Sequence, residues 1–298
     1  MWADWSDNMQ IIQYEQLTLE QQQMMRVLER VVQSHDQTKR QIYLSNQYNA
    51  NLSMPYAFLA AEDGQLIGFA VIYAEDDEVA EISLLVHPNY RQRGVATQLI
   101  QSVKVVCSQY QLTKIIFNTE KRFMQNNSEW AKKYYIDAGS VNEYLMEWQR
   151  QDMYSAEQGS RVDVSVATLT DCDSIAKGLA QAFESTEEIE RRYALESIRD
   201  ADTIQYVVKD LQQQIVGVCS VDCRIENLYY LFALCIFPKF QRKGYGREAV
   251  KQIIALLQEQ DSKAKIKLAV EVDNEAAIHL YQQCGFKRIA ELVALVEK

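Results

Sequence analysis

Residues 238–246 read Pro238-Lys239-Phe240-Gln241-Arg242-Lys243-Gly244-Tyr245-Gly246. They follow an apolar run, Leu228 to Phe237, and precede a helical pattern, Arg247 to Gln258. We therefore expect a strand, a tight turn containing glycine, and a helix in direct succession. Such a turn aims successive backbone N–H groups at one point, and the helix N-terminus adds about half a positive charge there. The sequence thus predicts a binding site for a phosphate or diphosphate group.

The side chains of this turn suit an anion. Gly244 and Gly246 remove bulk where the anion would approach the backbone. Arg242, Lys243 and Arg247 supply positive charge. An ordinary link between a strand and a helix has the same pattern, so the turn by itself does not define a function.

The same turn occurs a second time. Residues 88–96 read Pro88-Asn89-Tyr90-Arg91-Gln92-Arg93-Gly94-Val95-Ala96, at a distance of 238 − 88 = 150 residues. A second landmark, Gln65-Leu66-Ile67-Gly68, matches Gln214-Ile215-Val216-Gly217 at 217 − 68 = 149 residues. A repeat of this length indicates a duplicated domain rather than a solenoid.

Composition is consistent with two globular domains. The chain has 298 residues, of which 48% are hydrophobic and 24% charged, and its net charge is −10. This charge argues against a nucleic-acid partner, because a phosphate backbone requires a basic face. It is compatible with a cationic substrate, although a solvated acidic surface gives the same value.

The cysteines and the N-terminus indicate a reducing compartment. None of the six cysteines forms a Cys-x-x-Cys pair, and most lie in apolar patterns, as expected for core thiols. The first residues lack the pattern of a secretory signal, and no apolar run approaches the ~20 residues that span a bilayer. We expect a cytoplasmic protein without membrane contact.

The order of predicted elements gives the fold class. Strands, hairpins and helices alternate, which predicts an α/β (α+β) protein with a mixed sheet flanked by helices in each half. We expect domains at 1–150 and 161–298, joined by a polar linker at 151–160. Thr18 is predicted to begin a first helix through a capping box with Gln21, and a second helix is predicted from Gln37 to Tyr48.

One helix near the C-terminus carries a more specific pattern. After the strand Lys267 to Val272 come Asn274-Glu275-Ala276-Ala277-Ile278-His279-Leu280-Tyr281-Gln282-Gln283-Cys284-Gly285-Phe286. Asn274 is a good N-cap and Gly285 can end the helix in the left-handed conformation. Ala277, Tyr281 and Cys284 share one helix face.

With the glycine turn, this helix resembles the GNAT superfamily of N-acetyltransferases. The likeness rests on the turn Gln/Arg-x-x-Gly-x-Gly/Ala, followed about 30 residues later by Asn-x-x-Ala-x-x-x-Tyr-x-x-x-Gly-Phe. Both halves resemble the family, so the chain is similar in layout to its two-domain members. The resemblance implies acetyl-CoA as cosubstrate.

The resemblance also implies roles for particular residues of the second half. The diphosphate would lie on the turn, and the pantetheine arm would lie against the strand end at Cys235 and Ile236. Asn274 would contact the cofactor arm, and Tyr281 would lie near the thioester sulfur. The plain alternatives are a helix cap for Asn274 and a core aromatic for Tyr281. The expected turn residues are Gln241, Arg242, Lys243, Gly244, Tyr245 and Gly246.

The chemistry suits these residue types. An amine attacks a thioester only when neutral, and a lysine-like amine with a pKa of ~10.4 is almost wholly protonated at pH 7. A carboxylate or a chain of waters must take the proton. Backbone N–H groups at a splayed or bulged strand end can stabilise the developing oxyanion, and a tyrosine hydroxyl can protonate the leaving thiolate.

The first half departs from the pattern. Aligning Tyr135 with Tyr281 places Ser128 at Asn274 and Ser140 at Phe286. Its glycine turn is intact. The cofactor-binding residues expected there are Val86, Arg91, Arg93, Gly94, Val95 and Ala96.

Glu81 is the candidate general base of the first half, because many family members have a glutamate on this strand. A surface charge on the strand explains it equally well. At a distance of 150 residues, its counterpart in the second half is Leu231 (81 + 150 = 231), so the base of the second half is unidentified.

We predict an acetyl-CoA-dependent N-acetyltransferase acting on a primary amine of a small molecule or protein, with the C-terminal half as the better catalytic candidate. Three alternatives remain open: a non-catalytic acyl-CoA-binding protein, catalysis in the N-terminal half with Glu81 as base, and cooperation of the halves. No metal is expected, because His35, His87 and His279 are isolated.

Overall fold

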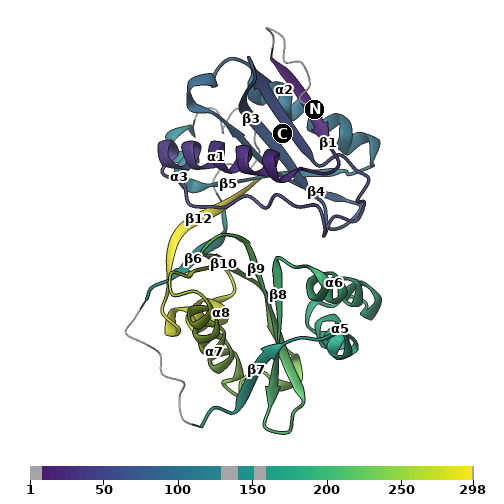
Figure 1. Cartoon of the computed structure of the whole chain (residues 1–298), viewed down its shortest axis with the longest axis vertical. Helices are drawn as coiled ribbons and strands as arrows, with labels where there is room; N and C mark the ends of the chain where they lie inside the picture. Colours follow the sequence, from purple (N-terminus) through teal and green to yellow (C-terminus); the bar gives the residue numbers. More distant parts are fainter. Residues whose placement is uncertain (1–8, 129–139, 151–158, 297–298) are drawn as a thin grey trace. The chain divides into compact units, whose positions relative to one another are not determined.

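The chain forms two compact units, each with its own hydrophobic core. A computed structural model describes residues 9–128, 140–150 and 159–296. Unit 1 comprises Met1–Asn142 together with Ala290–Lys298, and unit 2 comprises Glu143–Ile289. Both units combine a sheet with helices (Figure 1), so the predicted fold class is confirmed.

Unit 1 contains a mixed sheet with helices on both faces. Its elements are β1 (Gln10–Tyr14), α1 (Leu19–Asp36), β2 (Ala57–Glu62), β3 (Gln65–Tyr73), β4 (Val79–Val86), η1 (Pro88–Tyr90), α2 (Val95–Gln109), β5 (Lys114–Glu120), α3 (Lys121–Asn126) and the end of β12 (Phe286–Val296). The strand order is β1-β2-β3-β4-β5-β12, with β4 and β5 parallel and the other neighbours antiparallel. Figure 1 shows α1 in front of the strands and α2 behind them.

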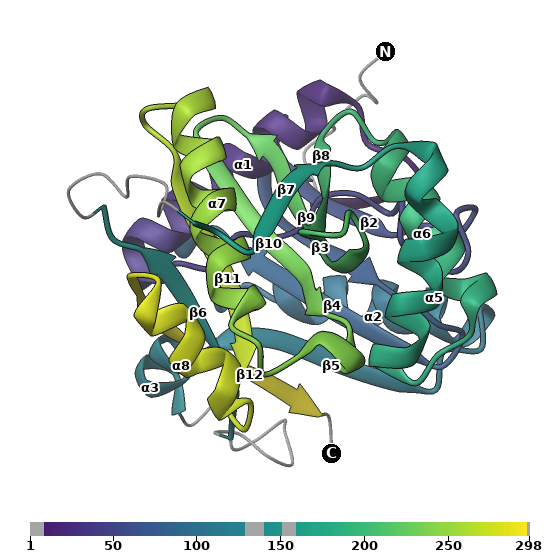
Figure 2. The same ribbon diagram turned by 90° about the horizontal axis from the view of Figure 1, so that it is seen from below.

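Unit 2 repeats this plan. Its elements are β6 (Val141–Trp148), β7 (Val162–Val166), η2 (Leu169–Asp171), α5 (Cys172–Phe183), α6 (Glu187–Arg199), β8 (Thr203–Asp210), β9 (Ile215–Ile225), β10 (Leu228–Ile236), η3 (Pro238–Phe240), α7 (Tyr245–Gln260), β11 (Lys265–Glu271), α8 (Glu275–Gln283) and the start of β12. The strand order is β7-β8-β9-β10-β11-β6, and only β10 and β11 are parallel. Figures 1 and 2 both show α7 on one side of the sheet and α5 and α6 on the other.

Two strands belong to units that lie far from them in the sequence. Residues 143–147 of β6 pair with β11 in unit 2, and residues 292–296 of β12 pair with β5 in unit 1. The sequence predicted a linear division into 1–150 and 161–298, and the observed units differ from it at these strands. Each strand supplies backbone partners to an edge that its own half of the sequence leaves open.

The predicted capping box is confirmed, and the predicted second helix is wrong. Thr18 and Gln21 cap α1 reciprocally. Gln37–Tyr48, however, contains no helix, because its backbone N–H groups are taken by buried side chains. The Glu120 carboxylate accepts from the N–H groups of residues 39 and 40, and the Glu29 carboxylate accepts from that of Ile42. These bonds replace the helical ladder.

Candidate active site

Both glycine turns have the predicted geometry. Gly94 and Gly244 have φ angles of 84° and 83°, and each is the N-cap of the helix that begins at the next residue. The residues two positions earlier, Gln92 and Arg242, are also left-handed, with φ angles of 60° and 61°. The succession of strand, turn and helix is therefore confirmed twice, and each turn presents a helix N-terminus to a possible anion.

The turn of unit 2 has a cationic side chain that the sequence did not reveal. A Cβ added to Gly244 would lie 2.6 Å from Nη2 of Arg161, so the guanidinium lies directly beside the turn. Arg161 is paired with Glu248 in the first turn of α7, and its Nε lies 2.9 Å from the carboxylate. Burial opposes ionisation of Glu248, but hydrogen bonds from Arg161 hold the pKa of this carboxyl below its usual value.

The predicted basic residues of this turn remain available to a ligand. Among the described residues, neither Arg242 nor Lys243 forms an ion pair with a carboxylate; Lys243 lies over the Phe240 ring, with Nζ 5.3 Å from its centroid. Gln241 is engaged instead, because its side-chain amide donates to the Ile236 carbonyl at 2.9 Å. Gln241 thereby joins the turn to the end of β10.

The turn of unit 1 differs in its side chains. Arg91 donates to the Val86 carbonyl at 3.1 Å and forms two bonds of 2.8 and 2.6 Å with the buried Asp36 carboxylate. Burial opposes ionisation of Asp36, but the bonds from Arg91 and His35 hold its pKa below the usual value. Arg93 pairs with the Glu62 carboxylate at 2.8 Å. Both predicted phosphate-binding arginines thus already have carboxylate partners.

Each sheet opens just before its glycine turn. In unit 2 the pairing of β10 with β11 runs from Leu228 to Leu231, whereas β10 continues to Ile236. In unit 1 the pairing of β4 with β5 likewise ends at Ile82. The strand ends that carry Cys235 and the predicted pantetheine contact therefore lie beyond the last paired residues.

Strand β10 contains a bulge at this place. Its register with β9 shifts between Phe232 and Cys235, which lie opposite Ser220 and Val218. Three steps along β10 thus oppose two steps along β9 (235 − 232 = 3 and 220 − 218 = 2). Ala233, inside the bulge, has a left-handed φ of 47°. Such a bulge disrupts the ladder and leaves backbone groups unpaired.

Strand β4 has no bulge. Four steps separate Ile82 from Val86, whereas five steps separate their structural counterparts, Leu231 and Ile236. This one extra residue explains why the hairpins repeat at 149 residues and the glycine turns at 150. The difference between those two distances was therefore a sequence signal for the bulge, which sequence reasoning missed.

The bulge corrects the alignment of Glu81. Ahead of the bulge the offset is 149, so its counterpart is Tyr230 (81 + 149 = 230) and not Leu231. Glu81 is exposed, and its carboxylate accepts a hydrogen bond of 2.7 Å from the Asn118 side chain. It lies five residues before the strand end at Val86.

Tyr281 lies in the core of unit 2. It is 8% exposed, and its ring packs edge-on against Phe286 at 5.8 Å between centroids. Burial, and to a smaller extent the nearby Cys219 and Cys284, raise the pKa of Tyr281 well above its usual value. The hydroxyl is therefore neutral at physiological pH and retains a proton to donate.

Asn274 is a helix cap, as its type suggests. Its side-chain oxygen accepts from the N–H of Ala277 at 3.1 Å and begins α8. Its predicted contact with a cofactor stays a prediction. In the first half, the helix predicted at 128–138, including Tyr135, lies outside the described residues apart from Ser128.

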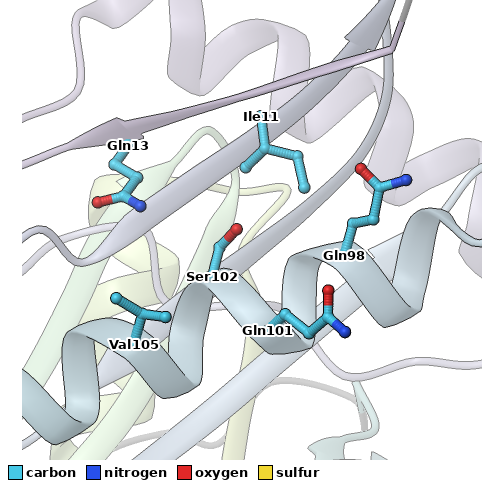
Figure 3. Close-up of a pocket in the computed structure, with 6 residues that line it drawn as sticks. All are labelled: Ile11, Gln13, Gln98, Gln101, Ser102 and Val105. Carbon is cyan, nitrogen blue, oxygen red and sulfur yellow. The ribbon is translucent and has the colours of Figure 1, made fainter.

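A groove elsewhere in unit 1 holds none of the predicted site residues. It lies between β1 and α2, has a volume of about 290 Å³ and is lined by Ile11, Gln13, Gln98, Gln101, Ser102 and Val105 (Figure 3). Its lining contains no titratable side chain.

The described residues exclude some other kinds of site. Across 9–128, 140–150 and 159–296, no group of three metal-ligating side chains comes together. Within those ranges, no helix has both the length and the apolarity to cross a bilayer. All six cysteines are free thiols, and only Cys223 is not buried.

Comparison with known proteins places the chain in a family. The model of the acetyltransferase (GNAT) family matches twice, over residues 21–134 and 172–286. The chain therefore belongs to the acetyltransferase (GNAT) family, and each unit contains one copy of its domain.

Two curated relatives are similar over parts of the chain. Spermidine N(1)-acetyltransferase of Vibrio cholerae is 30% identical over 114 residues, which cover 38% of this chain and 65% of that protein. N-alpha-acetyltransferase 50 of Danio rerio is 29% identical over 80 residues, covering 25% of this chain and 47% of that protein. The chain thus spans less than two thirds of the length of either relative.

Solved structures match over nearly the whole chain. A GCN5-related N-acetyltransferase from Sphaerobacter thermophilus has a TM-score of 0.72 at 14% identity, covering 97% of this chain and 95% of that one. A tandem GNAT protein from the clavulanic acid biosynthesis pathway has a TM-score of 0.70 at 10% identity, covering 97% and 98%. These likenesses confirm the tandem fold.

Proposed function

We propose that the protein transfers the acetyl group of acetyl-CoA to a primary amine, and that unit 2 carries the reaction. The observation that carries this proposal is the bulge in β10. It lies where the sheet opens and directly before the glycine turn. Unit 1 has the turn and the opening but not the bulge.

The residues of unit 2 fit coenzyme A at the turn. A diphosphate there would meet backbone N–H groups of the turn, the N-terminus of α7, and the cations Arg161, Arg242 and Lys243. Little room exists for a side chain in this region, because a Cβ on Gly246 would lie 2.9 Å from Leu280. Close approach of a ligand to the backbone is thereby preserved.

The residues beside the sheet opening suit acyl transfer. The bound thioester supplies an activated acetyl group. Backbone N–H groups freed at the Ala233 bulge would hold its carbonyl oxygen as negative charge develops there. Tyr281, kept neutral by burial, would give its hydroxyl proton to the departing sulfur.

Unit 1 lacks two of these features, which supports a single active unit. Its two turn arginines are already paired with Asp36 and Glu62. Its strand β4 has a regular register, so it offers no comparable oxyanion donors. Unit 1 is accordingly proposed to act as a structural partner, with Glu81 as a surface charge.

Acetyl transfer to a panel of amines tests the proposal. The panel includes spermidine and a peptide with a free N-terminus, the acceptor classes that the names of the relatives suggest. We expect transfer to at least one amine, and calorimetry to give one acetyl-CoA per chain. Saturable binding without transfer to any amine would instead support a non-catalytic acyl-CoA-binding protein.

A further inference from the structure

One buried carboxylate in unit 2 has almost no internal partner. Glu190, in α6, is only 7% exposed. Its Oε1 accepts a hydrogen bond from the Ser185 hydroxyl, and no other side chain or backbone N–H of the described residues donates to the carboxylate. A carboxylate has about four acceptor positions, so most of the capacity of this group is unused within the protein.

The other buried carboxylates among the described residues are better satisfied. Each accepts at least two hydrogen bonds, from backbone N–H groups, from an arginine or from both. They are Glu29, Asp36, Glu120, Asp210 and Glu248. Because an incompletely paired buried charge is destabilising, Glu190 requires an explanation that these groups do not.

Glu190 lies near the bulge. Burial, followed by the nearby Glu190 carboxylate, raises the pKa of the Cys235 thiol to about 11. Cys235 is the first paired residue after the bulge and lies opposite Val218. The carboxylate is thus close to the strand end at which the thioester is proposed to lie.

The carboxylate approaches from the face opposite Tyr281. Helices α5 and α6 lie on one side of the sheet of unit 2, and α7 and α8 lie on the other (Figure 1). Glu190 belongs to α6 and Tyr281 to α8. A thioester in the opening between β10 and β11 would therefore have Tyr281 on one side and Glu190 on the other.

The approach to Glu190 is acidic. The turn between α5 and α6 and the first turn of α6 carry three further glutamates, Glu184, Glu187 and Glu188, all exposed. Acidic residues also complement the N-terminus of α6, so by themselves they indicate no ligand. Beside a buried carboxylate with spare acceptor positions, they favour the approach of a cation.

We propose that Glu190 binds the ammonium group of the acceptor and removes one of its protons. This inference rests on the proposed function of unit 2. The proton moves to the carboxylate, and the neutral nitrogen then attacks the thioester carbon. As the C–N bond forms, the C–S bond breaks and the sulfur takes the Tyr281 proton. The second nitrogen proton restores Tyr281, and the proton on Glu190 passes to solvent.

The test compares Glu190→Gln and Glu190→Asp with wild type, using the best amine of the panel. Glu190→Gln keeps the size of the side chain and an acceptor for Ser185 but cannot take a proton. We expect its kcat/KM for the amine to fall by about 10²–10⁴. Its Kd for acetyl-CoA should stay within about twofold and its melting temperature should not fall. Glu196→Gln, an exposed change on the same helix, is the matched control.

The order of the two variants separates catalysis from a structural role. A proton acceptor needs a carboxylate, so Glu190→Asp should retain more activity than Glu190→Gln. A merely structural role gives the reverse order, since glutamine is the isostere. That reverse order, or a Glu190→Gln variant within threefold of an active wild type, overturns the assignment and leaves the proposed function standing. If wild type acetylates no amine, both proposals fail.

Discussion

Tyr281 combines burial with a proton that it keeps. Its raised pKa leaves the hydroxyl protonated throughout the physiological range, so its ionisation causes no loss of rate below a pH of about 10. Packing against Phe286 fixes the ring but does not explain the need for a hydroxyl. A phenylalanine at this position would preserve that packing.

We therefore expect Tyr281→Phe to lower kcat on the order of 10²-fold and to leave acetyl-CoA binding unchanged, because only the proton donor is removed. Steady-state kinetics and calorimetry provide the measurement. Tyr206→Phe is the control, since Tyr206 is equally buried in the core of unit 2 and has no proposed role. Full activity in Tyr281→Phe would show that the sulfur takes its proton from elsewhere.

The sequence revealed which residues form the turns but not their partners. Arg91 and Arg93 were expected to bind an anion, and both instead meet carboxylates. Asp36 is 55 residues upstream of Arg91 (91 − 36 = 55), and no local pattern links them. The same limit hid Arg161 beside Gly244 and Glu190 near Cys235, because both contacts depend on how helices dock on the sheet.

At the scale of elements, the difference between the two repeats is one residue in one strand. Strands β4 and β10 have similar apolar patterns, and both were predicted from them. The bulge does not appear in such a pattern, but it shifts the repeat distance from 149 to 150 residues. The predicted helix at 37–48 failed for a related reason, since buried carboxylates compete for its backbone N–H groups.

Deleting Ala233 should convert β10 to the regular register of β4. We expect the deletion variant to fold, because unit 1 forms the same sheet without the extra residue. Its kcat should fall by about 10²–10³, as expected for loss of an oxyanion donor. Initial rates and circular dichroism measure the two effects. Ala233→Gly is the control, because glycine accepts the left-handed φ and should keep both bulge and activity.

A deletion variant that is folded and fully active would remove the observation on which the choice of unit 2 rests. An unfolded variant would show instead that the strand cannot close without the extra residue. In that case, a partly active Ala233→Pro variant that still folds would contradict the oxyanion role, since proline cannot keep a left-handed φ.

At the scale of the molecule, each unit is completed by a strand from the other half of the sequence. Alternating apolar residues predicted strands at 144–148 and 289–296, and both exist within β6 and β12. Periodicity specifies that a segment is a strand but not which edge it joins. The exchange of strands was therefore beyond local sequence reasoning, although the duplication itself was evident.

The exchange predicts that a substitution near the C-terminus destabilises unit 1. Leu295, 1% exposed, lies opposite Phe117 of β5 and belongs to the core of that unit. Leu295→Ala should lower the free energy of unfolding by about 2–5 kcal/mol, the usual effect of such a cavity. Hydrogen exchange should show faster exchange of the β5 amides, with the β10 and β11 amides of unit 2 much less affected. Val296→Ala is the matched control, since Val296 is 36% exposed and should change stability by only about 0.5 kcal/mol. Protection lost first in β11 rather than in β5 would contradict the assignment of this strand to unit 1.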